Sequence, residues 1–255
     1  MKKAFVDYHC HLLPSLDDGS TDPQESVAMA RILARSGFDV VHCTPHRIKG
    51  CYENEPEKVR QATRLLQRLV HEEGIDLSLV AGTEHYLDEF LVDQLPGALT
   101  TGVSRHLLVE APFRSAPELV SAMVFGLINR GMSPLIAHPE RCNVFDPGPA
   151  TGSRGAFSFL RGKPKKHDLS GSLIVGLCEA GCRYQGNLGS FAGIYGSEIK
   201  ERAIVFLKEG IYSCVGSDAH RPDHLARYLS EGMETVVATV GEEAAFELFS
   251  AQALR

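Results

Sequence analysis

The sequence lacks tryptophan and any apolar run long enough to cross a bilayer. A transmembrane helix needs about 20 consecutive apolar residues, so we expect no membrane insertion. The N-terminus, MKKAFVDYHC, has two lysines but no apolar segment of the kind found in secretory signal peptides. The seven cysteines are odd in number and irregularly spaced, which indicates free thiols rather than a disulfide framework. We therefore expect a cytoplasmic protein.

Positive charge is also scarce. The chain has 26 Lys and Arg against 32 Asp and Glu, a net charge of −6, which argues against a nucleic-acid partner. No extended basic groove with interleaved aromatic residues is visible, and this disfavours a metal-dependent nuclease. The 255 residues, 44% of them hydrophobic, suffice for one large core, so we expect a single domain over residues 1–255.

Seven short segments rich in Val, Ile, Leu or Phe predict strands buried on both faces, because they lack clean alternation. They lie near 4–8, 39–44, 77–82, 106–110, 134–138, 183–187 and 211–217. Helices are expected near 23–37, 55–73, 117–130, 197–209, 223–237 and 242–253. This alternation indicates parallel βαβ units, and seven strands predict a TIM-like (β/α)7 barrel. An open doubly wound α/β sheet is the alternative.

One stretch, at about 146–171, interrupts this order with many glycines and prolines, and it predicts a loop-like insertion. It is also basic, with Arg154, Arg161, Lys163, Lys165 and Lys166. A solvated insertion is one interpretation. The other is a basic lid that attracts an anionic substrate or partner.

Potential metal ligands follow almost every predicted strand. Residues two apart on a strand point the same way, so His9 and His11 can reach one ion. In the DDG turn we prefer Asp18 as a ligand and interpret Asp17 as a turn residue. In a barrel the carboxyl ends of the strands meet on one face, so these residues predict one site there. The nine candidates are His9, His11, Asp18, His46, Glu84, Glu110, His138, Asp218 and His220.

Nine ligands exceed what one ion needs, since zinc takes about three or four protein ligands. If Glu84 bridges two ions, the set is large enough for three. Imidazoles and carboxylates without thiolates suit manganese, iron or zinc and suit magnesium poorly. Such ions make a bound water nucleophilic near neutral pH and neutralise charge on a phosphoryl group.

Three arginines, Arg47, Arg141 and Arg221, follow ligand clusters in TPHR, AHPER and SDAHR. A guanidinium matches the geometry of phosphate oxygens, so we interpret these arginines as substrate-binding residues. The chain has no cysteine followed six positions later by arginine, as a thiol-based phosphatase loop requires. The pattern therefore favours phosphate ester hydrolysis by metal-activated water.

Six segments together carry a family resemblance: DYHCHLLPSLDDG, TPHRIKG, AGTEHY, LLVE, AHPER and SDAH. In this order they resemble the polymerase-and-histidinol-phosphatase (PHP) superfamily, and within it the bacterial tyrosine-protein phosphatases of the CpsB/YwqE type. The resemblance implies a PHP-type barrel with three divalent ions, most often manganese, with iron or zinc as alternatives. It further implies phosphotyrosine hydrolysis on the C-terminal tail of a bacterial tyrosine kinase that controls capsule or exopolysaccharide synthesis.

By position, the resemblance also implies a division of the ligands among the ions. The first ion takes His9, His11, Glu84 and Asp218, the second takes Glu84, Glu110 and His138, and the third takes Asp18, His46 and His220. The three arginines correspond to the family's substrate-side residues. The stretch 146–171 is longer and more basic than the corresponding part of family members. We assign no role to the segment RYQGNLGSFAG.

Three other functions stay open from the sequence. A histidinol-phosphate phosphatase, or another small-molecule phosphatase of the superfamily, would use the same metal site. A non-catalytic regulator could bind the kinase without hydrolysing phosphate, although the complete ligand set disfavours it. A nuclease is disfavoured by charge. An oligomer is compatible with all of them.

Overall fold

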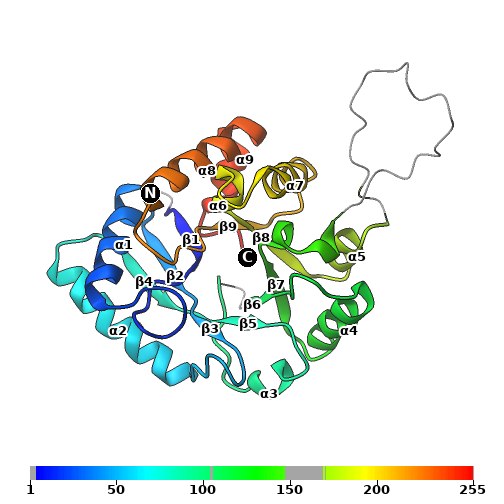
Figure 1. Cartoon of the computed structure of the whole chain (residues 1–255), viewed down its shortest axis with the longest axis horizontal. Coiled ribbons are helices and arrows are strands. Elements are labelled where there is room, and N and C mark those ends of the chain that lie inside the picture. The colour runs from blue at the N-terminus through cyan, green and yellow to red at the C-terminus, as the bar shows by residue number, and fades with distance from the viewer. Residues whose placement is uncertain (1–3, 104–105, 147–168, 170, 255) are drawn as a thin grey trace.

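The computed structural model describes residues 4–103, 106–146, 169 and 171–254, and Figure 1 shows its strands at the centre of a ring of helices. The strands are β1 Val6–Cys10, β2 Val40–Cys43, β3 His46–Arg47, β4 Ser78–Ala81, β5 Glu84–Tyr86, β6 His106–Glu110, β7 Ser133–Ala137, β8 Arg183–Asn187 and β9 Cys214–Gly216. The α-helices are α1 Pro23–Arg35, α2 Pro56–Glu72, α3 Leu91–Gln94, α4 Pro117–Ile128, α5 Leu173–Glu179, α6 Leu188–Ala192, α7 Ser197–Lys208, α8 Leu225–Val240 and α9 Glu242–Phe249. Two short 3₁₀ turns, η1 Pro139–Arg141 and η2 Asn143–Phe145, follow β7.

The paired strands all run parallel and form two sheets. One has the order β1-β2-β4, and the other has the order β3-β5-β6-β7-β8-β9. The predicted parallel α/β architecture is confirmed. The prediction of one closed, seven-stranded sheet is not, because the chain divides between β2 and β3 and between β4 and β5. The short strands β3 and β5 follow the predicted strands at 39–44 and 77–82 and belong to the second sheet.

Both divisions have a local cause. Pro45 separates β2 from β3, and proline has no N–H to donate to a strand ladder. Gly82 and Thr83 separate β4 from β5. Hydrogen bonds still cross the gap, since Gly82 N donates to Cys43 O at 2.9 Å and Glu84 N donates to Pro45 O at 3.1 Å. The segments β2–β3 and β4–β5 therefore pass from one sheet to the other while remaining hydrogen-bonded to each other.

The first and last strands also meet. Asp218 N donates to His9 O at 2.7 Å, and His11 N donates to Ala219 O at 3.0 Å. Cys10 and Ala219 form an isolated parallel bridge. The segment after β9 thus lies against β1 through single bonds rather than through a regular ladder.

The helix boundaries follow the capping signals in the sequence. Asp22 caps α1, accepting from Glu25 N at 2.8 Å, and Pro23 occupies the first turn. Pro56 and Pro117 likewise occupy the first turns of α2 and α4. Three short helices, α3, α5 and α6, were not predicted, because a segment of seven residues or fewer carries little periodic signal.

The predicted insertion and the expectation of no membrane span can each be compared with the described residues. Apart from Asp146, Leu169 and Gly171, the stretch 146–171 lies outside the described residues. Where the chain is described, no helix has both the length and the apolar content that a bilayer crossing requires.

Gly232 lies where helix α8 packs closely against the start of helix α6. A Cβ atom at this position would lie 2.4 Å from the Leu188 carbonyl oxygen, which is backbone and cannot rotate away. We expect Gly232→Ala to lower the free energy of unfolding by about 1–3 kcal/mol through overpacking. Urea denaturation measures this change.

Gly126→Ala, in helix α4, is the matched control. There a Cβ would meet only the end of the flexible Arg130 side chain, at 3.5 Å. Alanine has the higher helix propensity, so this variant should be as stable as the parent protein or more so. Equal stability of the two variants would contradict the close contact at Gly232.

Candidate metal centre

The nine predicted metal ligands gather at one place. They form four overlapping groups in which the ligand atoms all lie within 4.8 Å of one another, and each of the nine belongs to at least one group. The groups are His11, Asp18, His46 and His220; His9, His138 and Asp218; His9, His11 and Glu84; and His46, Glu84 and Glu110.

The short strands β3 and β5 and two unusual backbone conformations orient four of these side chains toward the centre of the cluster. His46 begins β3 and Glu84 begins β5, and the two are paired in register. His138 follows β7 with φ of 31°, and Asp218 follows β9 with φ of 51°. Positive φ is uncommon outside glycine and is often found where function demands a particular orientation. Local strain thus turns two ligands toward the others.

Glu84 lies at the middle of the cluster and is fully buried. Its Oε2 atom has three imidazole nitrogens around it: His9 Nε2 at 3.2 Å, His11 Nε2 at 3.3 Å and His46 Nδ1 at 3.1 Å. Its Oε1 atom lies 3.2 Å from His138 Nε2. A carboxylate with both oxygens surrounded in this way is suited to bridge two cations.

The contacts that His9 and His11 make through their Nδ1 atoms leave both Nε2 atoms available for a cation. His11 Nδ1 lies 2.7 Å from Asp17 Oδ2, and His9 Nδ1 lies 2.9 Å from Gln185 Oε1. These acceptors hold protons on the Nδ1 atoms, so the two Nε2 atoms face inward, 3.0 Å apart. With no proton on Nε2, both rings could bind a cation through bonds of about 2.1 Å, which fits this spacing.

The electrostatics of the centre also fit a cation. Burial lowers the pKa of His9, but Glu84 and Asp218 outweigh it and raise the pKa to about 9. Burial together with the charges of Glu84 and Asp218 raises the pKa of Glu110 to about 8. The carboxylates thus draw protons onto the cluster, and a divalent ion would compete with those protons for the same atoms.

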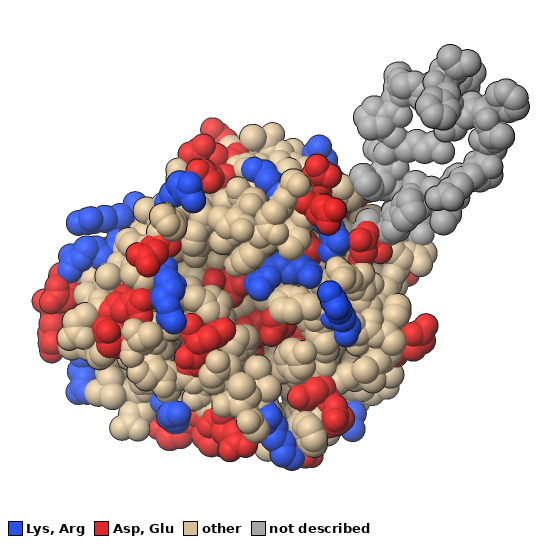
Figure 2. Space-filling model, viewed as in Figure 1, with Lys and Arg blue, Asp and Glu red and all other residues tan. Residues whose placement is uncertain are grey.

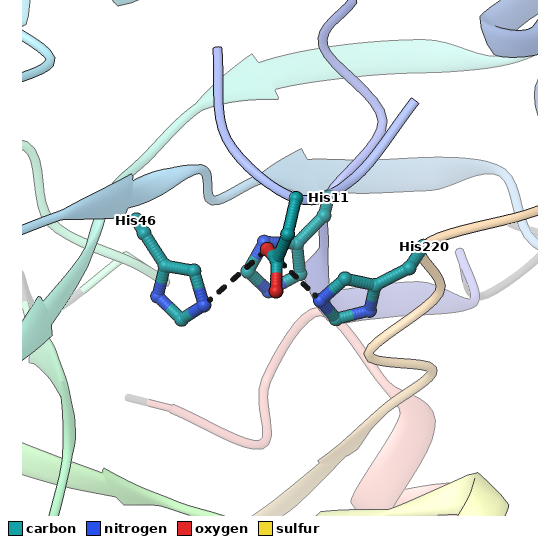
Figure 3. Close-up of side chains that lie close together, drawn as sticks. His11, His46 and His220 are labelled. Carbon is teal, nitrogen blue, oxygen red and sulfur yellow. Dashed lines mark ion pairs between the residues drawn. The ribbon is translucent and has the colours of Figure 1, made fainter. Parts of the chain in front are cut away.

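One group, made of Asp18, His46, His220 and His11, faces solvent. Figure 3 shows its three histidines converging. Asp18 Oδ1 lies 3.6 Å from His46 Nε2 and 3.4 Å from His220 Nε2. The Asp18 side chain is 52% exposed. Figure 2 shows basic and acidic side chains around a hollow near the middle of the molecule.

The three predicted substrate arginines are placed differently. Arg141 donates from Nη1 to Asp218 Oδ2 at 2.7 Å and so touches the cluster. Arg221 lies nearby and bonds the carbonyl oxygens of Gly19 and His220. The described contacts of Arg47 point elsewhere, to Gln94 O at 2.9 Å and to the Glu55 carboxylate.

Sequence reasoning missed three residues that hold the ligands. Asp17 accepts from Gly19 N, as a turn residue does, but its Oδ2 also meets His11 and accepts from His46 N at 2.8 Å. Asn187 Nδ2 donates to Asp218 Oδ2 at 2.8 Å. Gln185 and Asn187 are two apart on β8, and that spacing was the available signal for a shared face.

Comparisons with known proteins identify a family. The family model described as "Capsular polysaccharide synthesis, CpsB/CapC" matches residues 5–146 and 168–255. The match therefore leaves out residues 147–167, inside the stretch predicted to be an insertion.

The similar proteins include named phosphatases. Tyrosine-protein phosphatase YwqE of Bacillus subtilis is 29% identical over 245 residues, which are 95% of this chain and 88% of that protein. Tyrosine-protein phosphatase CpsB of Streptococcus pneumoniae is 25% identical over 254 residues, which are 96% of this chain and 94% of that protein.

Solved structures show a similar fold. The YwqE structure, described as that of a metal-dependent tyrosine phosphatase, superposes with a TM-score of 0.80 at 29% identity over 95% of this chain and 90% of that one. A histidinol phosphate phosphatase from Lactococcus lactis superposes with a TM-score of 0.53 at 14% identity, covering 97% of each chain. At that identity the second likeness concerns the fold alone.

Asp17 is the outer residue whose removal is easiest to interpret. Asp17→Asn keeps the size of the side chain but removes the negative charge beside His11 Nδ1. Because outer carboxylates orient metal-binding histidines and raise their basicity, we expect manganese affinity to fall roughly 10- to 100-fold. Titration of the metal-free protein with manganese, in competition with a chelator, measures this loss.

Asp22→Asn is the control, because asparagine caps a helix as well as aspartate does and Asp22 belongs to α1 rather than to the centre. Its manganese affinity should equal that of the parent protein. The orienting role of Asp17 is refuted if the two variants bind manganese equally well.

Proposed function

The chain belongs to the CpsB/CapC family of capsular polysaccharide synthesis, and from this we propose that it is a metal-dependent protein-tyrosine phosphatase. The observation that carries the proposal is the buried Glu84 carboxylate, with imidazole nitrogens around both of its oxygens. Arg141 adjoins this cluster through Asp218 and supplies a phosphate-binding group. The similar proteins named above are tyrosine-protein phosphatases, which supports the same activity here.

We also propose that the two sheets are parts of one distorted (β/α)7 barrel of the PHP type, in a single domain over residues 1–255. In this arrangement β2 with β3, and β4 with β5, each count as one strand of the barrel. The bonds between β1 and residues 218–219 support closure of the ring. The superposition on YwqE supports the fold assignment.

For the cofactor we propose three divalent ions, with manganese as the native metal and iron or zinc as alternatives. The proposed division is His9, His11, Glu84 and Asp218 for the first, Glu84, Glu110 and His138 for the second, and Asp18, His46 and His220 for the third. The solvent-facing group supports the third set. For the second set, His138 Nε2 lies 3.8 Å from Glu110 Oε1. The ligand group that contains Glu110 and Glu84, however, has His46 as its third member.

Such ions, when bound, supply a water of near-neutral pKa and neutralise charge on the phosphoryl group. The residues of the chain supply the rest. Arg141 can donate to phosphate oxygens beside Asp218, and Arg221 lies at the solvent-facing group. Burial raises the pKa of the Cys10 and Cys43 thiols, which makes both poor nucleophiles. A covalent cysteine intermediate is therefore not part of the proposal.

As substrate we propose phosphotyrosine in the C-terminal tail of a bacterial tyrosine kinase of capsule or exopolysaccharide synthesis. We propose that the enzyme acts in the cytoplasm. We keep Arg47 as a proposed substrate residue as well, although its described contacts lie with Gln94 and Glu55. Histidinol-phosphate hydrolysis is the second candidate, because the same ligand set suits any phosphomonoester and the Lactococcus enzyme shares the fold.

The substrate is tested by phosphate release from a phosphotyrosine peptide and from histidinol phosphate, side by side. The protein is first stripped with EDTA and then supplied with manganese. We expect no turnover after stripping and a higher kcat/KM for the peptide after manganese is restored, because turnover needs the ions and the peptide matches the proposed substrate. A preference for histidinol phosphate would overturn the tyrosine-phosphatase assignment but leave the metal site in place.

The ligand roles are tested by His138→Ala and Asp218→Ala. Each removes a buried ligand, and we expect kcat/KM to fall roughly a thousandfold or more, because several kcal/mol of transition-state stabilisation depend on the ions. His71→Ala, at an exposed position of α2, should leave the rate unchanged. Circular dichroism checks the fold of each variant, and full activity in both ligand variants would sink the proposed site.

A further inference from the structure

Arg141 lies between two aromatic rings beside the metal centre. Its guanidinium carbon is 4.4 Å from the centre of the Tyr195 ring and 5.2 Å from the centre of the Phe113 ring. Guanidinium groups are attracted to aromatic faces and stack on them. The two rings and Asp218 therefore hold this arginine where a phosphate group would meet it.

Phe113 differs from an ordinary surface residue. Its side chain is 45% exposed, yet its ring centre lies 6.5 Å from that of the metal-ligand candidate His138. The loop that carries it is anchored, because Asn143 N donates to the Phe113 carbonyl oxygen at 3.2 Å. A large part of an aromatic ring is thus kept in contact with solvent beside the reaction centre.

Tyr195 plays a different part from Phe113. Its side chain is only partly exposed, whereas that of Phe113 is exposed. The Tyr195 ring is the closer of the two to the Arg141 guanidinium. Tyr195 is therefore a positioning residue for the arginine, and the more exposed Phe113 ring is the one with surface left for a ligand.

We propose that Phe113 is a specificity-determining residue that selects aryl phosphates, with the substrate's phenyl ring packed against Phe113 while its phosphate meets Arg141. This inference rests on the proposed phosphatase function. Phosphotyrosine carries its ring directly on the ester oxygen, whereas phosphoserine has a single methylene there and then the peptide backbone. A ring–ring contact stabilises the bound aryl ester beyond simple burial, and an alkyl ester cannot make it.

The test is a binding measurement that needs no turnover. Phenylphosphonate and methylphosphonate are titrated into the manganese-loaded protein, with and without Phe113→Ala. We expect the variant to bind phenylphosphonate roughly fivefold more weakly, as loss of one aromatic pair implies, and to bind methylphosphonate with unchanged affinity. Phe113→Tyr, which keeps the ring, should retain the preference for the phenyl ligand.

Phe125→Ala is the matched control, since Phe125 is 44% exposed on the outer helix α4. It should change neither affinity. If Phe113→Ala weakens both ligands equally, Phe113 merely supports Arg141 and the proposal is wrong. Unchanged binding of phenylphosphonate would overturn it as well.

Turnover separates this inference from the function on which it rests. Phosphotyrosine and phosphoserine peptides of otherwise equal sequence are compared in the parent protein and in Phe113→Ala. We expect the variant to lose kcat/KM for the phosphotyrosine peptide through a higher KM, with little change for phosphoserine. If the parent protein hydrolyses neither peptide, the phosphatase proposal fails, and the phosphonate ratio still decides the role of Phe113.

Discussion

A carboxylate buried among imidazoles is the constraint on which the rest of the site depends. Glu84 is fully buried, and an unpaired charge at that depth would be strongly unfavourable. Four histidine nitrogens at 3.1–3.3 Å compensate it. The breaks before β3 and β5 place His46 and Glu84 side by side, and His138 approaches the carboxylate from a left-handed backbone conformation. The irregular features of the sheets thus coincide with the residues that surround one carboxylate.

A shell of acceptors and donors around the ligands keeps this arrangement in one orientation. Asp17 joins two chain segments, because it contacts the His11 ring and the backbone of His46. From β8, Gln185 contacts the His9 ring and Asn187 donates to the Asp218 carboxylate, so both connect β8 to the ligands. Ligands from distant parts of the sequence therefore share their supports, so the centre is expected to form as a unit rather than one ligand at a time.

The sequence predicted what depends on local pattern. Apolar runs predicted the parallel strands, and prolines predicted the helix starts at Pro23 and Pro117. The residues at the strand ends predicted nine ligands that do converge. It failed where the outcome depends on contacts between distant segments. The two-sheet division, the direction of the Arg47 side chain and the contact of Asp17 with His11 are set by tertiary neighbours, which no local spacing records.

The metal centre and its surroundings divide the tasks of catalysis and selection between them. In the proposed mechanism the cluster of histidines and carboxylates acts on the phosphoryl group, and that group is the same in phosphotyrosine and in histidinol phosphate. Such a cluster therefore cannot by itself distinguish one phosphomonoester from another. Selection has to come from residues that meet the part of the substrate beyond the ester oxygen. In this chain Phe113 lies next to both Arg141 and His138, so the side chain proposed to meet the leaving group adjoins the residues proposed to act at the phosphate.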